Sequence, residues 1–220
     1  MGRSYLVGTI ALLLLTTALG ARAWAAQPSA MEIVSRALAT QAGVEDYVAT
    51  VAVTVDAPNI HVPRRTMTVY YKRPDKVHVE SAGLVVIPRD ALVLGGLRKH
   101  FEENAAATLA GTGTLNGRPV HCVKLTPKES VGTDRVLCWI DSERYVLLKS
   151  EIWHGSSRAL MVSLTHTKAG KGFLMPESIV CDIPAWVLGD SAEPGKITVS
   201  FSDYQINTGL DDSIFEEDNS

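Results

Sequence analysis

Apolar and polar residues alternate over most of this chain. In residues 47–56 and 64–73, one set of alternate positions is apolar or aromatic, and many of the residues are β-branched. A period of two with such residues is typical of strands that bury one face. The same pattern predicts eight further strands, in residues 76–81, 108–115, 120–125, 135–140, 145–153, 160–167, 173–182 and 196–204.

Two segments do not follow the period of two. Ser29 can cap a helix that buries Ile33 and ends near Gly43. Residues 89–103 could form either a helix that is broken at its paired glycines or a short strand and a loop, and we favour helical turns. The chain is therefore expected to have few helices beside many strands.

Short signals separate these elements. Asn116-Gly117 is a strong tight-turn pair, and Pro176 marks an edge strand, a bulge or a strand start. Residues 183–195 contain two prolines, so we expect a loop there. Residues 211–220 are acidic, and we expect them to form a solvated tail.

The spacing of the elements predicts the fold class. Ten regularly spaced strands, most of them without a helix between, indicate a mainly β (α+β) fold. We expect a curved antiparallel sheet that forms an incomplete barrel. The concave face of such a sheet is apolar and must be covered. The N-terminal helix and the middle helical segment are the natural lids or plugs.

The first 26 residues have the pattern of an export signal. A short basic start precedes an uncharged apolar run in residues 5–20, and Ala23-Trp24-Ala25 is a small-x-small cleavage pattern. The alternative is an uncleaved anchor, but this run is shorter than the ~20 residues that a membrane span needs. No cysteine is present in it to carry a lipid. We expect residues 1–26 to be a signal peptide, residues 27–220 to form one domain, and the protein to be periplasmic.

Composition and charge exclude several classes of protein. With 46% hydrophobic and 20% charged residues, the chain is too apolar to be disordered. Its formal net charge of -3 does not suggest nucleic acid as a partner.

No set of residues has the spacing of a catalytic or metal site. The six histidines include no pair at helical spacing and no H-E-x-x-H motif. His121 and Cys122 are neighbours in a predicted strand, so their side chains point to opposite faces and cannot easily share a metal. We expect no enzymatic activity, no metal and no cofactor.

The three cysteines leave two interpretations open. Cys122 and Cys138 flank a loop near Ser130 and could form a disulfide across a hairpin, which would leave Cys181 unpaired. Alternatively, all three are small buried hydrophobic residues, which is the interpretation we favour.

Residues 70–80 carry a resemblance to a known family. Tyr70-Tyr71-Lys72-Arg73-Pro74, followed by an alternating charged strand, resembles the K-R-P element that ends an early strand in LolA/LolB-type periplasmic lipoprotein-sorting carriers. The order of signal peptide, helix and two strands before it is also similar. Residues 116–127 and 139–151 resemble later strands of the wider family. The resemblance covers most of residues 29–215.

The resemblance implies a fold and a function. It implies a half-barrel that binds the acyl chains of lipoproteins or lipids and ferries them towards the outer membrane, with membrane-bound donor and acceptor proteins as partners. It implies that Arg73 holds a lid closed at the cavity edge, and Val69 and Tyr71 share its face and should line the cavity. His78 and Glu80 depart from the aromatic residues of many carriers. A lipid-sensing or partner-binding envelope regulatory domain on the same fold is the alternative.

Overall fold

The computed structural model describes residues 27–57, 60–81, 105–128, 134–188 and 193–216. The predicted signal peptide and the predicted middle helix therefore lie outside the described residues. The first strands are β1 (Asp46–Ala57), β2 (Ile60–Lys72), β3 (Lys76–Ser81), β4 (Ala105–Leu115) and β5 (Arg118–Pro127). The others are β6 (Arg135–Asp141), β7 (Leu147–His154), β8 (Ser157–Ala169), β9 (Phe173–Ile183) and β10 (Gly195–Ile206). The described helices are α1 (Ala30–Ala39), α4 (Ala185–Leu188) and the 3-10 helix η1 (Asp212–Phe215).

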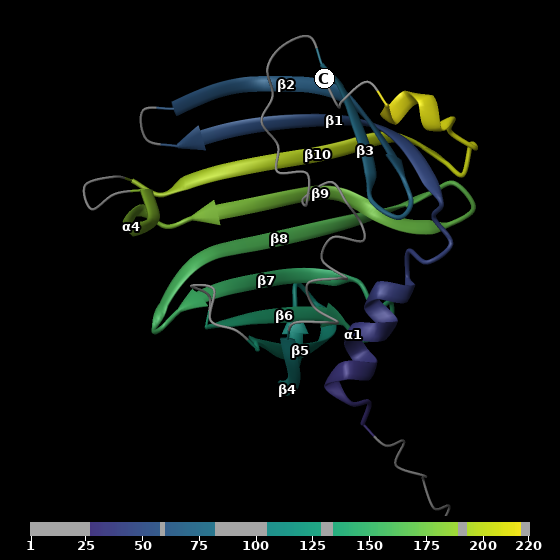
Figure 1. The fold of residues 1–220 in the computed structure, drawn as a ribbon. Coiled ribbons are helices and arrows are strands. Elements are labelled where there is room, and N and C mark those ends of the chain that lie inside the picture. The colour runs from purple at the N-terminus through teal and green to yellow at the C-terminus, as the bar shows by residue number, and fades with distance from the viewer. Residues whose placement is uncertain (1–26, 58–59, 82–104, 129–133, 189–192, 217–220) are drawn as a thin grey trace, which may run out of the picture.

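The ten strands form one antiparallel sheet, which confirms the predicted fold class. Their order is β3-β2-β1-β10-β9-β8-β7-β6-β5-β4. Consecutive strands are therefore neighbours in the sheet except β3 and β4, which lie at opposite edges, and the last strand, β10, also pairs with the first, β1. The sheet is strongly curved and does not close, because β3 and β4 remain its two edges (Figure 1). An incomplete barrel of this kind has one concave and one convex face.

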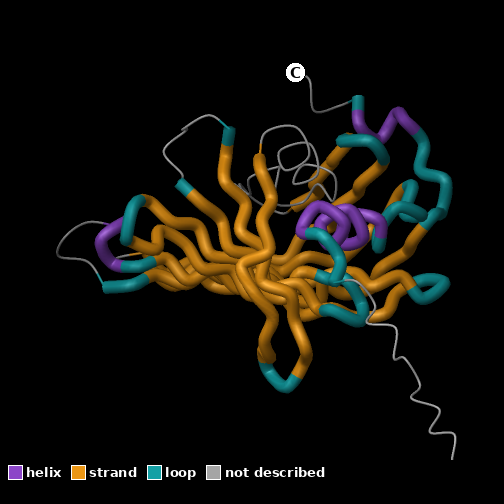
Figure 2. The backbone as a smooth tube through the Cα atoms, turned by 90° about the horizontal axis from the view of Figure 1, so that it is seen from below, coloured by secondary structure: helices purple, strands orange, loops and turns teal. Residues whose placement is uncertain are grey.

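Helix α1 lies on the concave side of the sheet (Figure 2). The Ser29 side chain accepts a hydrogen bond from the Glu32 amide at 3.2 Å, as the capping pattern predicts. Ile33 and Val34 are buried against the end of the sheet that contains β4 and β5. The helix ends at Ala39, earlier than the predicted end near Gly43, because the chain then passes through turns into β1.

Buried apolar residues form two clusters on the concave face. The first cluster joins β1, β2, β3, β9 and β10, and contains Val44, Tyr47, Ala49, Val51, Val53, Met67, Val69, Tyr71, Val77, Met175 and Phe201. The second cluster joins α1 to β4, β5 and β6, and contains Ala30, Ile33, Val34, Ala105, Val123, Leu125, Cys138 and Ile140. The two clusters therefore occupy opposite ends of one curved sheet.

The turn signals agree with the structure. Asn116 and Gly117 have φ values of 50° and 77°, which is the backbone conformation that a tight hairpin needs. Pro176 lies at a register irregularity between β8 and β9, which selects the bulge among its predicted roles.

One prediction needs correction. The segment 183–195 is predicted to be a loop, but it contains α4, a helix too short to show a period. The predicted solvated tail begins with η1, and Asp211 and Asp212 are exposed. Asp212 also forms ion pairs with Lys72 and Lys76 at 2.6 and 3.0 Å. These opposite charges attach the start of the tail to the edge of the sheet.

Candidate functional site

A continuous row of apolar side chains crosses the concave face. Because residues directly opposite each other in a sheet share a face, the strand register defines this row. From β1 to β4 it runs through Val55, Ile197, Cys181, Val162, Ser150, Cys138, Val123 and Leu109. Seven of the eight strands thus contribute one apolar residue each to the row, and β7 contributes the polar residue Ser150.

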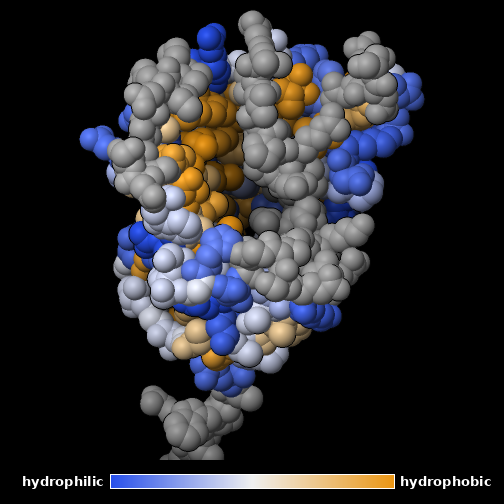
Figure 3. Space-filling view, turned by 60° about the vertical axis from the view of Figure 1, so that its left-hand side comes forward, coloured by the Kyte–Doolittle hydropathy of each residue, from blue (hydrophilic) through white to orange (hydrophobic). Residues whose placement is uncertain are grey.

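The middle of this row is less buried than its second-cluster end. Val123 and Cys138 belong to the second cluster, with exposures of 0% and 4%. In the middle, five half-buried side chains lie outside both clusters, and we call them the apolar strip: Ile152, Leu160, Val162, Leu164 and Cys181. Seen from the end of the sheet where β1 and β9 finish, the surface is apolar and hollowed (Figure 3). The strip is therefore the candidate binding surface.

Two residues predicted to line the cavity lie in the first cluster. Val69 and Tyr71 are on the concave face, with exposures of 0% and 2%. The Tyr71 ring stacks on Tyr47 at 5.2 Å, and its hydroxyl donates to the Pro74 carbonyl at 3.1 Å. Burial raises the pKa of Tyr71 above its usual value. These side chains form a packed wall at one end of the concave face.

Arg73 follows the end of β2. Its guanidinium lies 3.9 Å from the Glu45 carboxylate, and its amide donates to the Glu45 carbonyl at 2.8 Å. Glu45 belongs to the segment that connects α1 to β1. Arg73 therefore contacts the connection of the covering helix, and its side chain is about one-third exposed.

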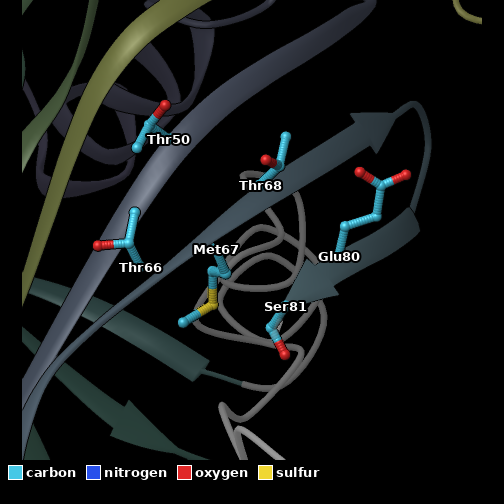
Figure 4. A pocket seen from close by; sticks show the side chains of 6 residues that line it. All are labelled: Thr50, Thr66, Met67, Thr68, Glu80 and Ser81. Atoms are coloured by element: carbon cyan, nitrogen blue, oxygen red, sulfur yellow. The ribbon is translucent and has the colours of Figure 1, made fainter. Parts of the chain in front are cut away.

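A recess of about 460 Å³ lies elsewhere, near the β3 edge of the sheet. Its lining is Thr50, Thr66, Met67, Thr68, Glu80 and Ser81. Figure 4 shows Thr68 and Glu80 pointing to the opposite side of the strands from Met67 and Ser81. Because its lining is largely polar, this recess does not suit an acyl chain.

The cysteines are all free thiols, so the disulfide considered between Cys122 and Cys138 is not present. The register explains why: Cys122 is opposite Trp139, whereas Cys138 is opposite Val123, which places the two thiols on opposite faces. Burial raises the pKa of Cys138 to about 12, and it also raises the pKa values of Cys122 and Cys181. Cys181 lies on the apolar strip.

The sequence does not distinguish the residues of the strip from those of other strands. The K-R-P element marks β2, whereas residues 160–164 carry the same alternation of apolar positions. Their strand was predicted, but nothing local showed that it would lie in the middle of the concave face.

Among the residues that the structure describes, no three His, Cys, Asp or Glu side chains are grouped so that they could hold a metal ion. No described helix is both long enough and apolar enough to cross a membrane.

Comparison with known proteins places the chain in a family. A family model with the description "Uncharacterized protein" matches residues 94–219, which is more than half of the chain. The chain belongs to this family. No curated protein matches the sequence.

Solved structures share the fold of this family member. An outer membrane lipoprotein-sorting protein domain from Vibrio parahaemolyticus is similar over 86% of this chain and 97% of its own, with TM-score 0.65 and 13% identity. A DUF1329 family protein from Desulfovibrio piger is similar over 87% of this chain and 99% of its own, with TM-score 0.64 and 12% identity. A LolA superfamily protein from Nitrosomonas europaea is also similar over 87% of this chain and 99% of its own, with TM-score 0.61 and 16% identity. The structure therefore has the LolA-type fold that the K-R-P element suggested.

Proposed function

We propose that this protein is an exported carrier that binds the acyl chains of lipoproteins or lipids on the apolar strip and moves them across the periplasm towards the outer membrane. The observation that carries the proposal is the half-buried strip in the middle of an otherwise packed concave face. The fold shared with a lipoprotein-sorting protein domain supports it.

The dimensions and chemistry of the row suit an acyl chain. From Ile197 on β10 to Cys138 on β6 the row crosses four strand spacings, which is about 19 Å at ~4.8 Å each. Each CH₂ group removed from water contributes about 0.8 kcal/mol. A long chain on this surface would therefore be held mainly by burial of apolar area, without a catalytic residue or a cofactor.

Val69, Tyr71 and Arg73 have separate roles in the proposal. Val69 and Tyr71 form the wall at which a bound chain ends, since they are packed on the same face as the strip. Arg73 secures the α1–β1 connection through Glu45. Ligand entry would loosen that contact, as the resemblance implies for the K-R-P arginine.

Location and partners complete the proposal. Residues 1–26 would direct export to the periplasm, and membrane-bound proteins would supply and accept the cargo. A cargo that is insoluble in water needs such a donor and acceptor at each end of its path.

One observation favours the alternative of a partner-binding domain. Trp186, Val187 and Leu188 of α4 are 47%, 45% and 39% exposed, and they are consecutive. Exposed apolar residues in a group are typical of interaction surfaces. A regulatory domain would use this surface, whereas a carrier depends on the strip.

Cysteine protection tests the carrier function directly. Delipidated protein is treated with N-ethylmaleimide with and without palmitate, and modification of each cysteine is followed by peptide mass spectrometry. We expect palmitate to slow the modification of Cys181 several-fold, because this thiol lies on the strip. Cys122 is the internal control, since it lies on the convex face and should react equally in both samples.

Native mass spectrometry of the purified protein identifies a natural cargo. A co-purified acylated species supports the proposal. Three results together would contradict the proposal: Cys181 is modified at the same rate with and without palmitate, no lipid co-purifies, and no fluorescent fatty acid binds.

A further inference from the structure

A buried polar side chain interrupts the apolar surface near α1. His121 of β5 is 9% exposed, and it lies opposite Ile140 of the second cluster, so it is on the concave face. Its Nδ1 atom is buried and has no hydrogen-bond partner. A buried nitrogen without a partner costs free energy, so this position is suited to a polar group that arrives with a ligand.

Tyr145 lies beside His121. The two rings are 6.5 Å apart, and Tyr145 packs against the second cluster. Its hydroxyl accepts a hydrogen bond from Arg36 of α1 at 2.9 Å, and the Arg36 guanidinium also lies over the Tyr145 ring at 5.0 Å. Arg36 donates a second hydrogen bond to Glu32. The Tyr145 hydroxyl is thus polarised by a cation.

Asp141 holds Tyr145 in place. Its carboxylate is completely buried and accepts hydrogen bonds from the Arg118 side chain and from the backbone amides of Glu143 and Arg144, both at 2.9 Å. The Tyr145 amide donates to the Asp141 carbonyl at 2.9 Å, and Tyr145 has a φ of 54°. The turn between β6 and β7 is therefore fixed by several hydrogen bonds, and the ring that it presents is preorganised.

We propose that His121, Tyr145 and Arg36 form a head-group site for the anionic end, carboxylate or phosphate, of an acyl ligand. This inference rests on the proposed function. Val123 lies two residues from His121 on the same face of β5, and its row leads through Cys138 and Ser150 to Val162 of the strip. A chain on the strip would then place its polar end at the imidazole and phenol donors beside the α1 cation.

The test compares ligands that share a chain and differ in the head group. Binding of oleate, oleyl alcohol and oleoyl-lysophosphatidate is measured by displacement of a fluorescent fatty acid. A hydrogen bond to a charged group supports a preference of about tenfold, so we expect an anionic ligand to bind about tenfold more tightly than oleyl alcohol. Whether oleate or the lysophosphatidate binds more tightly distinguishes a carboxylate from a phosphate ligand, and either result supports the site.

Two variants separate the head-group site from the strip. Tyr145→Phe removes only the hydroxyl, and His121→Leu removes the unpartnered nitrogen. Both should reduce the preference for the anionic ligand to about threefold or less, while the affinity for oleyl alcohol stays within about twofold. Tyr70→Phe is the matched control, because the Tyr70 hydroxyl donates to Glu80 near the β3 edge and its loss should change neither value.

The outcomes separate this inference from the function on which it rests. Equal binding of all three ligands by the unchanged protein, or an unchanged preference in Tyr145→Phe, overturns the head-group site and leaves the carrier function standing. Failure of every ligand to bind overturns both. Thermal unfolding checks that each variant is folded. If His121→Leu does not fold, Tyr145→Phe alone decides the test.

Discussion

The first cluster and the apolar strip lie on the same face of the same sheet, yet they differ in burial. In the first cluster, Met175 and Val69 are 0% exposed and are packed among aromatic rings. In the strip, Val162 and Leu164 are only half-buried although they are equally apolar. A strand's own residues therefore make a face apolar, but the segments that pack over that face decide whether it becomes core or binding surface.

The difference has a structural cause. The first cluster is completed by Val44 from the α1–β1 connection and by the aromatic contacts of Tyr47 with Tyr71 and Tyr204, at 5.2 and 5.6 Å. The second cluster is completed by α1. The strip lies between these two coverings. Its exposure would cost stability in a protein without a ligand, and under the proposed function a bound acyl chain provides the missing contacts.

The largest effect is expected from Met175→Ala. Met175 is completely buried in the first cluster, and truncation of such a side chain costs about 2–5 kcal/mol in the free energy of unfolding. Leu164→Ala in the strip should cost about 1 kcal/mol or less, because its surroundings are partly open to solvent. Urea denaturation of the ligand-free variants measures both. Equal losses would mean that the strip is ordinary core.

The second largest effect on stability is expected at the buried carboxylate of Asp141, at the start of the turn between β6 and β7. Asp141→Asn weakens the bonds to Arg118 and to two backbone amides, so we expect a loss of about 2 kcal/mol in the free energy of unfolding. Glu177→Gln, at an exposed position, is the control and should have little effect. If Asp141→Asn also has little effect, the β6–β7 turn is not fixed by this carboxylate.

The hydrogen bonds of Asp141 also predict that the stability of the fold depends on pH. Burial alone would raise the pKa of Asp141, but the hydrogen bonds from Arg118 and from the amides of Arg144 and Glu143 lower it below its usual value. A carboxyl group with a lowered folded-state pKa stabilises the fold fully above its unfolded pKa of about 3.9, and this stability is lost as the pH falls through the folded pKa. Acid unfolding should therefore be less steep in Asp141→Asn than in the unchanged protein.

A smaller effect is expected in ligand affinity. Leu164→Ala should weaken palmitate binding by about 1–2 kcal/mol, or about five- to thirty-fold, because it removes apolar contact with the chain. Thr165→Ala is the neighbouring control, since Thr165 is exposed and pairs with Ser178 rather than with a residue of the strip. Fluorescent fatty-acid displacement measures both affinities, and equal affinities would remove the strip from the binding site.

The smallest effect on stability is expected from Arg73→Leu. The Arg73–Glu45 ion pair is long, at 3.9 Å, and partly exposed, so its loss should cost less than about 1 kcal/mol. The rate of lipid release should nevertheless change, because the pair connects the end of β2 to the segment after α1. Stopped-flow transfer of a fluorescent fatty acid to vesicles measures that rate. An unchanged release rate would mean that Arg73 is an ordinary surface residue with no role in lipid release.

Local pattern determined much of the fold. Alternation located all ten strands, Asn116-Gly117 located a tight turn, and Ser29 located the start of α1. These features depend on residues that are close together in the sequence. The period of apolar residues and the residue types at turns and caps are therefore enough to locate them. The K-R-P element at Arg73 indicated the family of folds for the same reason, because it is a short local motif.

Only the tertiary structure decided which apolar residues form the binding surface. The pairing of β10 with β1 brings Val55 into one row with Ile197 and Cys181, which come from the other end of the chain. The position of α1 completes the second cluster, whereas Val162 of the strip is left half-buried. Burial depends on contacts between segments that are far apart in sequence, and the alternation within a single strand is the same whether its apolar face becomes core or remains open to a ligand.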